Sequence, residues 1–178
     1  MSALALLADY LNTLNCTLLD IIMDCSHIQF KYVEGLNDTD LGQLVELFQQ
    51  AAFWARDRSA EKMKVAIANS NPVVTAWKGE QLIGFARATS DGVFRATIWD
   101  VVIHPDYQGA GLGRRLVETV LGHPLMNCVE RVYLTTTYQQ RFYERIGFTE
   151  NQSTTMVLFN QQIEPVPQLA AADSATGN

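Results

Sequence analysis

The chain has little cysteine, and its cysteines are not spaced as a metal or redox motif. Cys16, Cys25 and Cys128 are an odd number and form no Cys-x-x-Cys pair, and the three histidines are scattered along the 178 residues. A disulfide framework and a zinc site therefore do not fit this sequence. We expect no metal cofactor, and we expect the reducing environment of the cytoplasm.

Basic residues are also scarce. Thirteen Lys and Arg stand against nineteen Asp and Glu, which gives a formal net charge of −6. This balance argues against nucleic acid and against an anionic membrane surface as partners, because both attract basic patches. The first thirty residues are apolar but contain no Lys or Arg, and Asp9, Asp20 and Asp24 interrupt them. We therefore expect neither an export signal, which begins with basic residues, nor a membrane span of about 18 apolar residues.

The length predicts a single domain. Leucine periodicity at the N-terminus and a change of composition after Asn160 predict an extension at each end. We expect an N-terminal amphipathic helix over residues 1–26, a folded domain over 27–160 and a flexible tail over 161–178. The N-terminal helix carries leucines at spacings of three and four, from Leu4 to Leu18. Such a stripe either docks on the domain or associates with a second copy, so the protein is expected to be a monomer or a homodimer.

Hydrophobic periodicity within the domain predicts alternating strands and helices. The expected strands are 27–33, 73–77, 82–88, 95–103, 131–135 and 154–159. The expected helices follow caps at Asn37 and Ser59 and cover 111–121 and 138–146. This order is typical of an α/β (α+β mixed) domain, in which helices flank a central mixed sheet.

A glycine-rich loop, Gly109–Gly113, precedes the expected helix 111–121. Glycines allow the backbone to curl close to a phosphate, and the N–H groups at a helix start favour an anion. Arg114 and Arg115 oppose the dipole of that helix unless they meet a phosphate. The spacing fits neither a dinucleotide loop, whose third glycine would fall at Arg114, nor a Walker loop, which needs Gly-Lys followed by Ser or Thr.

Two motifs resemble those of the GNAT N-acetyltransferase family. The first is Gln-x-x-Gly-x-Gly, formed by Gln108, Gly111 and Gly113, which follows the sequence Val-Val-Ile-His-Pro-Asp-Tyr. The second, Arg-Phe-Tyr-Glu-Arg-Ile-Gly-Phe over residues 141–148, resembles the family's F-Y-x-x-x-G-F helix. Residues 84–92 resemble more narrowly the plastid and cyanobacterial branch, which includes serotonin N-acetyltransferase-like enzymes. The resemblance implies a mostly antiparallel central sheet, acetyl-CoA as cosubstrate and acetyltransferase activity.

The same resemblance implies which residues contact acetyl-CoA. Backbone groups of Val101, Val102 and Ile103 would bind the pantetheine arm, and one N–H would polarise the thioester carbonyl. Thr136 stands where many relatives carry an Asn that contacts the pantetheine. The residues implied to hold the pyrophosphate are Gln108, Gly109, Ala110, Gly111, Leu112, Gly113 and Arg114.

Tyr143 matches the family's general acid, because a phenol with a pKa of about 10 is protonated at neutral pH and can donate to the departing thiolate. Asp100 is the candidate base, as the carboxylate of the strand 95–103. The family's usual base positions fall at Thr97 and Trp99, which we assign to the acceptor pocket. Since strands alternate faces, Asp100 reaches that pocket only if a bulge intervenes.

We therefore expect transfer of an acetyl group from acetyl-CoA to a primary amine by direct attack in a ternary complex. The acceptor is either an arylalkylamine, such as serotonin or tryptamine, or a protein lysine or N-terminus. Phe53, Trp54 and Trp99 either offer aromatic surface to it or pack in the core. The alternative is a non-catalytic module that senses acyl-CoA and acts through its N-terminal helix. A different acyl donor is also compatible, because the loop binds the pyrophosphate.

Overall fold

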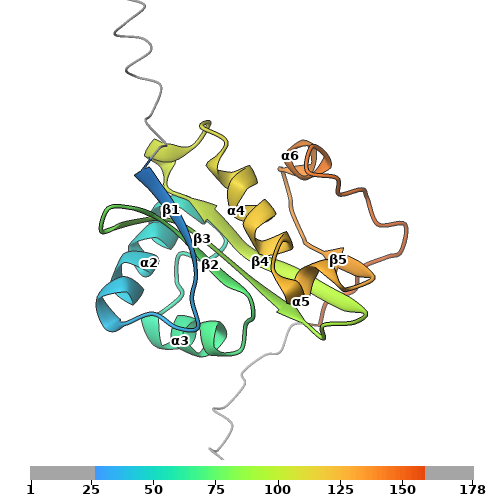
Figure 1. The fold of residues 1–178 in the computed structure, drawn as a ribbon, viewed down its shortest axis with the longest axis horizontal. Coiled ribbons are helices and arrows are strands. Elements are labelled where there is room, and N and C mark those ends of the chain that lie inside the picture. The colour runs from blue at the N-terminus through green and yellow to red at the C-terminus, as the bar shows by residue number, and fades with distance from the viewer. Residues whose placement is uncertain (1–26, 159–178) are drawn as a thin grey trace, which may run out of the picture. The chain divides into compact units, whose positions relative to one another are not determined.

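The computed structural model describes residues 27–158, so the predicted N-terminal helix over 1–26 and the predicted tail over 161–178 lie outside the described residues. The chain divides into two compact units, one ending at Phe148 and the other beginning at Thr149. Every helix and strand that the structure describes belongs to the first unit (Figure 1).

A five-stranded sheet in the order β1-β2-β3-β4-β5 forms the centre of this first unit. Its strands are β1 (Ile28–Tyr32), β2 (Val73–Lys78), β3 (Gln81–Ser90), β4 (Arg95–Ile103) and β5 (Arg131–Tyr133). The first four strands pair antiparallel, and β5 pairs parallel with β4. The expected mixed, mostly antiparallel sheet of an α/β domain is confirmed.

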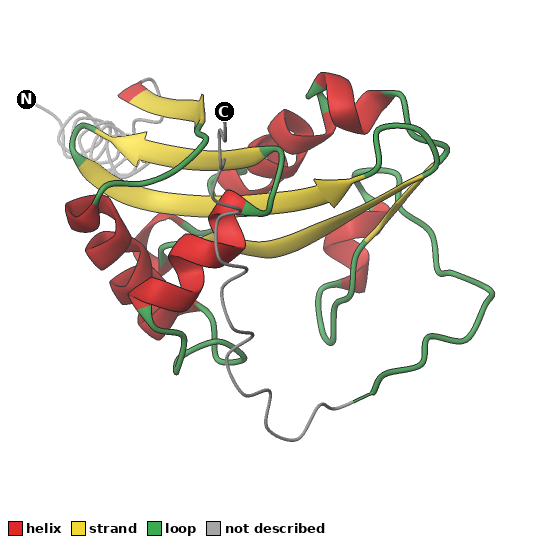
Figure 2. Cartoon of the chain, turned by 90° about the horizontal axis from the view of Figure 1, so that it is seen from below, coloured by secondary structure: helices red, strands yellow, loops and turns green. Residues whose placement is uncertain are grey.

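Helices cover both faces of the sheet (Figure 2). The helices are α2 (Asp38–Ala51), α3 (Ala60–Ala68), α4 (Leu112–Leu121), α5 (Pro124–Asn127) and α6 (Gln140–Glu144). Both predicted caps are confirmed, because the Asn37 side chain accepts a hydrogen bond from the Asp40 amide and that of Ser59 accepts one from the Lys62 amide. These side chains satisfy backbone donors that have no partner within the helix.

Successive side chains of the strands point to opposite faces of the sheet, and they form one hydrophobic core on each face. In β2, Val73 packs with α2 and α3, whereas the next residue, Val74, packs with α4 on the opposite face. A central strand that is apolar on both faces is what a sheet between two helical layers requires. The sheet therefore positions α4 relative to β4. The segment that connects the end of β4 to the start of α4 contains the glycine-rich loop.

The predicted strand at 154–159 is wrong within the described residues. Residues 154–158 form no strand, and Met156 and Leu158 are almost fully exposed. Apolar alternation describes one face of a strand, but a strand also needs a neighbour that pairs with its backbone. The helix predicted at 138–146 is shorter than expected, and α5 was not predicted.

Strand β5 pairs with only the beginning of β4. Arg95–Thr97 lie opposite Arg131–Tyr133, and within the described residues no strand pairs with β4 on this side from Ile98 to Ile103. Unpaired N–H and C=O groups of a strand edge are available to an extended ligand. We call residues 98–103 the open edge of β4.

Gly84 sets how closely β3 approaches the end of β4. A Cβ at Gly84 would lie 2.7 Å from Ile103 Cδ1 and 3.1 Å from Ala76 Cβ. We expect Gly84→Ala to lower the free energy of unfolding by about 1–2 kcal/mol, because overpacking displaces these neighbours.

Gly42 of α2 is the matched control, because a Cβ built there has no atom within 4 Å. Gly42→Ala should therefore raise that free energy by about 0.5–1 kcal/mol. Denaturant titration measures both changes, and equal stability of the two variants would contradict this account.

Candidate functional site

The connection between β4 and α4 folds back onto the end of β4. The His104 amide donates to the Ile83 carbonyl at 2.8 Å, and the Gln108 side chain donates through Nε2 to the Ile103 carbonyl at 2.9 Å. A short 3-10 turn, Pro105–Tyr107, lies between them. Gln108, predicted to contact the pyrophosphate, thus uses its side chain to anchor the loop to the strand.

The start of α4 has the features of an anion site. Gly109 and Gly111 have φ values of 84° and 77°, in the left-handed region that glycine adopts without strain. Gly111 is the N-cap residue of α4. Among the described residues, no side chain caps the start of this helix, and no acidic residue lies in its first turn. The backbone from Gly109 to Gly111 is exposed. The first N–H groups of the helix therefore carry an uncompensated partial positive charge.

The two last residues of this loop have structural roles that the motif alone does not reveal. Leu112 is buried in the core beneath α4. A Cβ at Gly113 would lie 3.4 Å from Phe142 Cζ, so glycine allows α4 to lie close to α6. Gly113 therefore links the two sequence motifs in space.

The arginines that follow the glycines have protein partners. Arg114 pairs through Nε with Glu118 Oε1 at 2.7 Å, and both side chains are exposed. The Arg115 guanidinium lies over the Phe30 ring, 4.8 Å from its centroid. An exposed pair within one helix contributes little free energy, so Arg114 can exchange Glu118 for a phosphate at low cost.

β4 contains the bulge that Asp100 would need in order to reach the acceptor pocket. Phe85 pairs with Val102 but Arg87 pairs with Trp99, so β4 carries one extra residue opposite Ala86. Asp100 adopts a φ of 58°, unusual for a residue with a side chain. Val101, beside it, is half-buried against the core that also packs Tyr143. The bulge thus changes the direction of β4 within its open edge.

Asp100 does not present a free carboxylate. Its Oδ1 lies 2.7 Å from Arg58 Nη1, and its Oδ2 lies 2.7 Å from Arg87 Nε. Its side chain is 4% exposed. Oδ2 therefore accepts a charge-assisted hydrogen bond from Arg87, and Oδ1 forms an ion pair with Arg58, so the carboxylate has little access to water or to a substrate. The base role of Asp100 stays a prediction that this geometry does not favour.

Trp99 and Thr97, predicted in the acceptor pocket, lie on β4 next to the bulge. Trp99 is 39% exposed and donates through Nε1 to Thr89 Oγ1 at 3.0 Å. The Arg87 guanidinium lies 5.9 Å from the centroid of the Trp99 ring. Thr97 is half-buried and takes part in the last β4–β5 pair. Trp99 is therefore an oriented aromatic surface rather than a core residue.

Tyr143 lies on α6, and its ring makes edge-to-face contacts with two others. The ring centroids of Phe142 and Phe148 are 4.8 Å and 5.9 Å away. Burial raises the pKa of Tyr143 to about 12. Thr136, upstream of α6, accepts a hydrogen bond from the Gln139 amide at 3.1 Å and so shapes the turn into the helix. The phenol is protonated throughout the neutral range, as a general acid must be.

The structure adds an aromatic cluster that the motifs did not predict. Phe53 and Trp54 lie in the loop between α2 and α3, with ring centroids 5.2 Å apart, and Tyr138 lies 6.3 Å from Phe53 in the segment that leads to α6. Their exposed fractions are 60%, 51% and 77%. The aromatic residues Phe53 and Trp54 thus offer surface rather than pack in the core, and no sequence spacing indicates that Tyr138 joins them.

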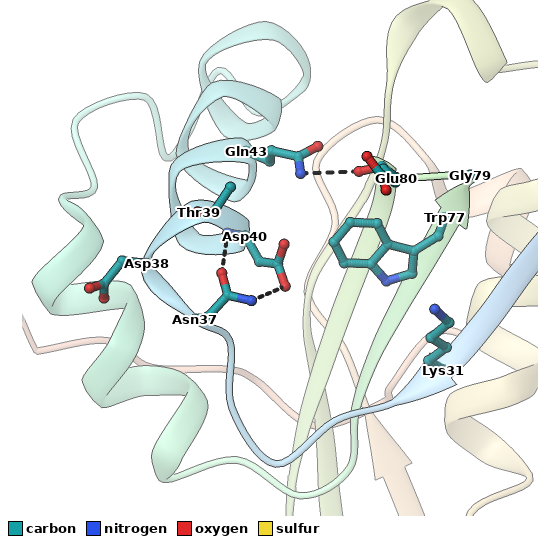
Figure 3. A pocket seen from close by; sticks show the side chains of 9 residues that line it. All are labelled: Lys31, Asn37, Asp38, Thr39, Asp40, Gln43, Trp77, Gly79 and Glu80. Carbon is teal, nitrogen blue, oxygen red and sulfur yellow. Dashed lines mark hydrogen bonds between the residues drawn. The ribbon is translucent and has the colours of Figure 1, made fainter.

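A hollow between the start of α2, Lys31 of β1 and the β2–β3 turn contains none of the predicted site residues (Figure 3). Two of its polar side chains, Asn37 and Gln43, hold the local structure together. Asn37 caps α2, and Gln43 donates to the Glu80 carbonyl at 3.2 Å while it accepts from the Leu82 amide at 2.9 Å. We therefore assign this hollow no chemistry.

Within residues 27–158, no group of three His, Cys, Asp or Glu side chains is arranged to hold a metal ion. In the same range, no helix has the length and apolar character needed to cross a membrane.

Known proteins with this combination of sheet, loop and helix define one class. Residues 41–148 match the family model of the Acetyltransferase (GNAT) family. A GNAT-family acetyltransferase from Streptococcus pneumoniae has the same fold, with a TM-score of 0.63, 25% identity, and coverage of 76% of this chain and 99% of the other. The chain belongs to the GNAT family and is an acetyltransferase.

Sequence relatives define the branch within the family. The uncharacterized N-acetyltransferase ycf52 of Pyropia yezoensis is 33% identical over 153 residues, which cover 78% of this chain and 84% of the relative. The chloroplastic GCN5-related N-acetyltransferase 2 of Arabidopsis thaliana is 47% identical over 70 residues, 39% of this chain and 27% of the relative. The resemblance to the plastid and cyanobacterial branch is confirmed.

The raised pKa of Tyr143 is measurable by alkaline titration. We expect the difference between the tyrosinate absorbance titrations of the wild type and Tyr143→Phe to show a group that ionises near pH 12. An unfolded tyrosine ionises near pH 10. The neutral phenol's contribution to stability is therefore fully present below about pH 10 and lost as the pH rises through about 12. A difference curve centred near pH 10 would show that the ring is not buried as described.

Proposed function

We propose that this acetyltransferase moves an acetyl group from acetyl-CoA to a primary amine by direct attack in a ternary complex. The observation that carries the proposal is the open edge of β4, which leads directly to the uncapped start of α4. An extended chain with a pyrophosphate at one end fits such a track, because the edge offers a row of backbone groups and the helix start attracts an anion.

The pantetheine arm would pair with the backbone of Val101, Val102 and Ile103 as an added strand. The pyrophosphate would accept hydrogen bonds from the N–H groups of residues 109–114. A Cβ built on Gly109 or Gly111 has no atom within 4 Å, so the backbone there is open to a ligand. Arg114 would leave Glu118 and pair with a phosphate oxygen.

Catalysis would proceed through one tetrahedral intermediate. The amine nitrogen attacks the thioester carbon, and a backbone N–H of the open edge stabilises the oxyanion that forms. The C–S bond then breaks, and Tyr143 donates its proton to the thiolate of CoA. Because the pKa of Tyr143 is raised to about 12, the phenol releases this proton only as thiolate charge develops. The proton that the attacking nitrogen loses from the tetrahedral intermediate can then reprotonate Tyr143.

The amine must be uncharged when it attacks, and the proton acceptor at this step is not assigned to a side chain. Asp100 is enclosed by two guanidinium groups, and Thr136 cannot act as a base at neutral pH. This arrangement favours solvent water as the acceptor of the ammonium proton.

For the amine that receives the acetyl group we keep both classes, arylalkylamines and protein lysines or N-termini, because the exposed aromatics Phe53, Trp54 and Trp99 can contact either.

We keep the prediction of a cytoplasmic monomer or homodimer as part of the proposal. Relatives include proteins named as chloroplastic, so cell fractionation has to decide between the cytoplasm and a plastid.

The acid role of Tyr143 predicts a selective loss of turnover. We expect the wild type to release CoA thiol from acetyl-CoA when tryptamine or a lysine peptide is added. Tyr143→Phe should lower kcat by roughly 100-fold or more, since general acids contribute at least that much, with the KM for acetyl-CoA within about twofold of wild type. A continuous thiol assay measures these constants.

Tyr138→Phe is the matched control, because Tyr138 is exposed, lies just before α6 and loses the same hydroxyl. Its kcat should equal that of the wild type. Full activity of Tyr143→Phe would refute the acid assignment. Thermal stabilisation by CoA without turnover of any amine would instead support the non-catalytic acyl-CoA-sensing module.

A further inference from the structure

Two arginines from different segments of the chain meet at the buried carboxylate of Asp100. Arg58 comes from the loop before α3, and Arg87 comes from β3, so the carboxylate joins three separate segments of the chain. We call Arg58, Asp100 and Arg87 the loop clamp. Both N···O distances are 2.7 Å, which is within the ordinary range of charge-assisted contacts.

Further contacts hold both arginines in place. The Arg58 guanidinium lies 5.5 Å from the centroid of the Phe48 ring, and the Arg87 guanidinium lies 5.9 Å from that of Trp99. Arg87 also donates through Nη1 to Ser70 Oγ at 3.0 Å. Each guanidinium thus has an Asp100 oxygen 2.7 Å from one of its nitrogens and an aromatic ring beside it, so the orientation of both side chains is determined by more than one contact.

The clamp fixes a loop that carries exposed aromatic rings. Residues 52–59 connect α2 to α3 and contain Phe53 and Trp54. At one end of this loop Arg58 binds Asp100 in the bulge of β4, and at the other end Phe53 contacts Tyr138, in the segment that leads to the helix of Tyr143. The loop therefore joins the bulge of β4 to the connection between β5 and α6.

Stability alone explains this arrangement poorly. Replacing a buried ion pair with apolar groups of similar size is often neutral or stabilising, so buried charges are weak evidence of a purely stabilising role. Asp100 in addition holds a left-handed φ of 58°. Strained backbone and buried charge together are characteristic of functional sites.

We propose that the loop clamp is a positioning device for the amine acceptor, which holds residues 52–59 so that Phe53 and Trp54 form one wall of the acceptor site opposite Trp99. This proposal rests on the acetyltransferase function proposed above. Asp100 acts in it through the two arginines and not as a base. The loop clamp lies beside Trp99, which is assigned to the acceptor site, and it shares no residue with the pyrophosphate loop at 109–114.

Arg58→Gln is the main test, because the Arg58 side chain is 34% exposed and its loss leaves the Arg87–Asp100 pair intact. We expect the KM for the amine to rise roughly tenfold, with the KM for acetyl-CoA within about twofold, since only the acceptor side is displaced. Arg58→Lys restores a charge near Asp100 and should recover part of the loss. The amine is whichever of tryptamine and the lysine peptide the wild type acetylates.

Arg56→Gln is the matched control, because Arg56 lies in the same loop and is exposed. It should leave both KM values unchanged. Asp100→Asn should reproduce the effect of Arg58→Gln. If Asp100→Asn abolishes kcat while Arg58→Gln has no effect on either KM, Asp100 is the base and the clamp proposal is wrong.

Amide hydrogen exchange tests the clamp without any turnover. We expect Arg58→Gln to speed exchange in residues 52–59, where the amides of Ala55 and Arg58 bond to carbonyls within the loop, and to leave residues 109–121 unchanged. Unchanged exchange in 52–59 would overturn the proposal. If no amine is acetylated even by the wild type, the proposed function fails, whereas the exchange result still decides whether the clamp holds the loop.

Discussion

Strand β4 pairs with β5 over three residues and then continues without a partner on that side among the described residues. The other features of the site follow from this interruption. The backbone of Val101–Ile103 is left with hydrogen-bonding groups that a ligand can satisfy, as sheet edges do elsewhere. The same strand ends at the glycine-rich loop, so a ligand that follows the edge arrives at the uncapped start of α4.

The bulge at Asp100 connects this edge to the acceptor side. One extra residue in β4 changes the strand's direction, and the carboxylate at that point holds Arg58 of the α2–α3 loop and Arg87 of β3. The backbone on one side of the bulge is assigned to acetyl-CoA, and the aromatic side chains on the other side are assigned to the amine. In the proposed arrangement, a single distortion of β4 separates the two substrate sites while it keeps them adjacent.

Much of the fold was predictable because each element carries its own local signal. The caps Asn37 and Ser59, the apolar face of α4 and the glycines of the loop act within a few residues of chain. Contacts between distant segments were not predictable in this way. No spacing indicates that Arg58 and Arg87 enclose Asp100, that Tyr138 meets Phe53, or that Gly113 faces Phe142. The strand expected at 154–159 failed for the same reason, since a pairing partner is a property of the fold.

The central claim is that CoA lies along the open edge of β4 with its pyrophosphate at the start of α4. Amide chemical-shift mapping by NMR during titration with CoA tests it most directly. The account predicts that the largest shift changes fall on the amides of residues 101–103 and 109–114, and that the hollow near Asn37 and Gln43 is unaffected. Shift changes concentrated at that hollow, with residues 101–103 and 109–114 unchanged, would contradict it.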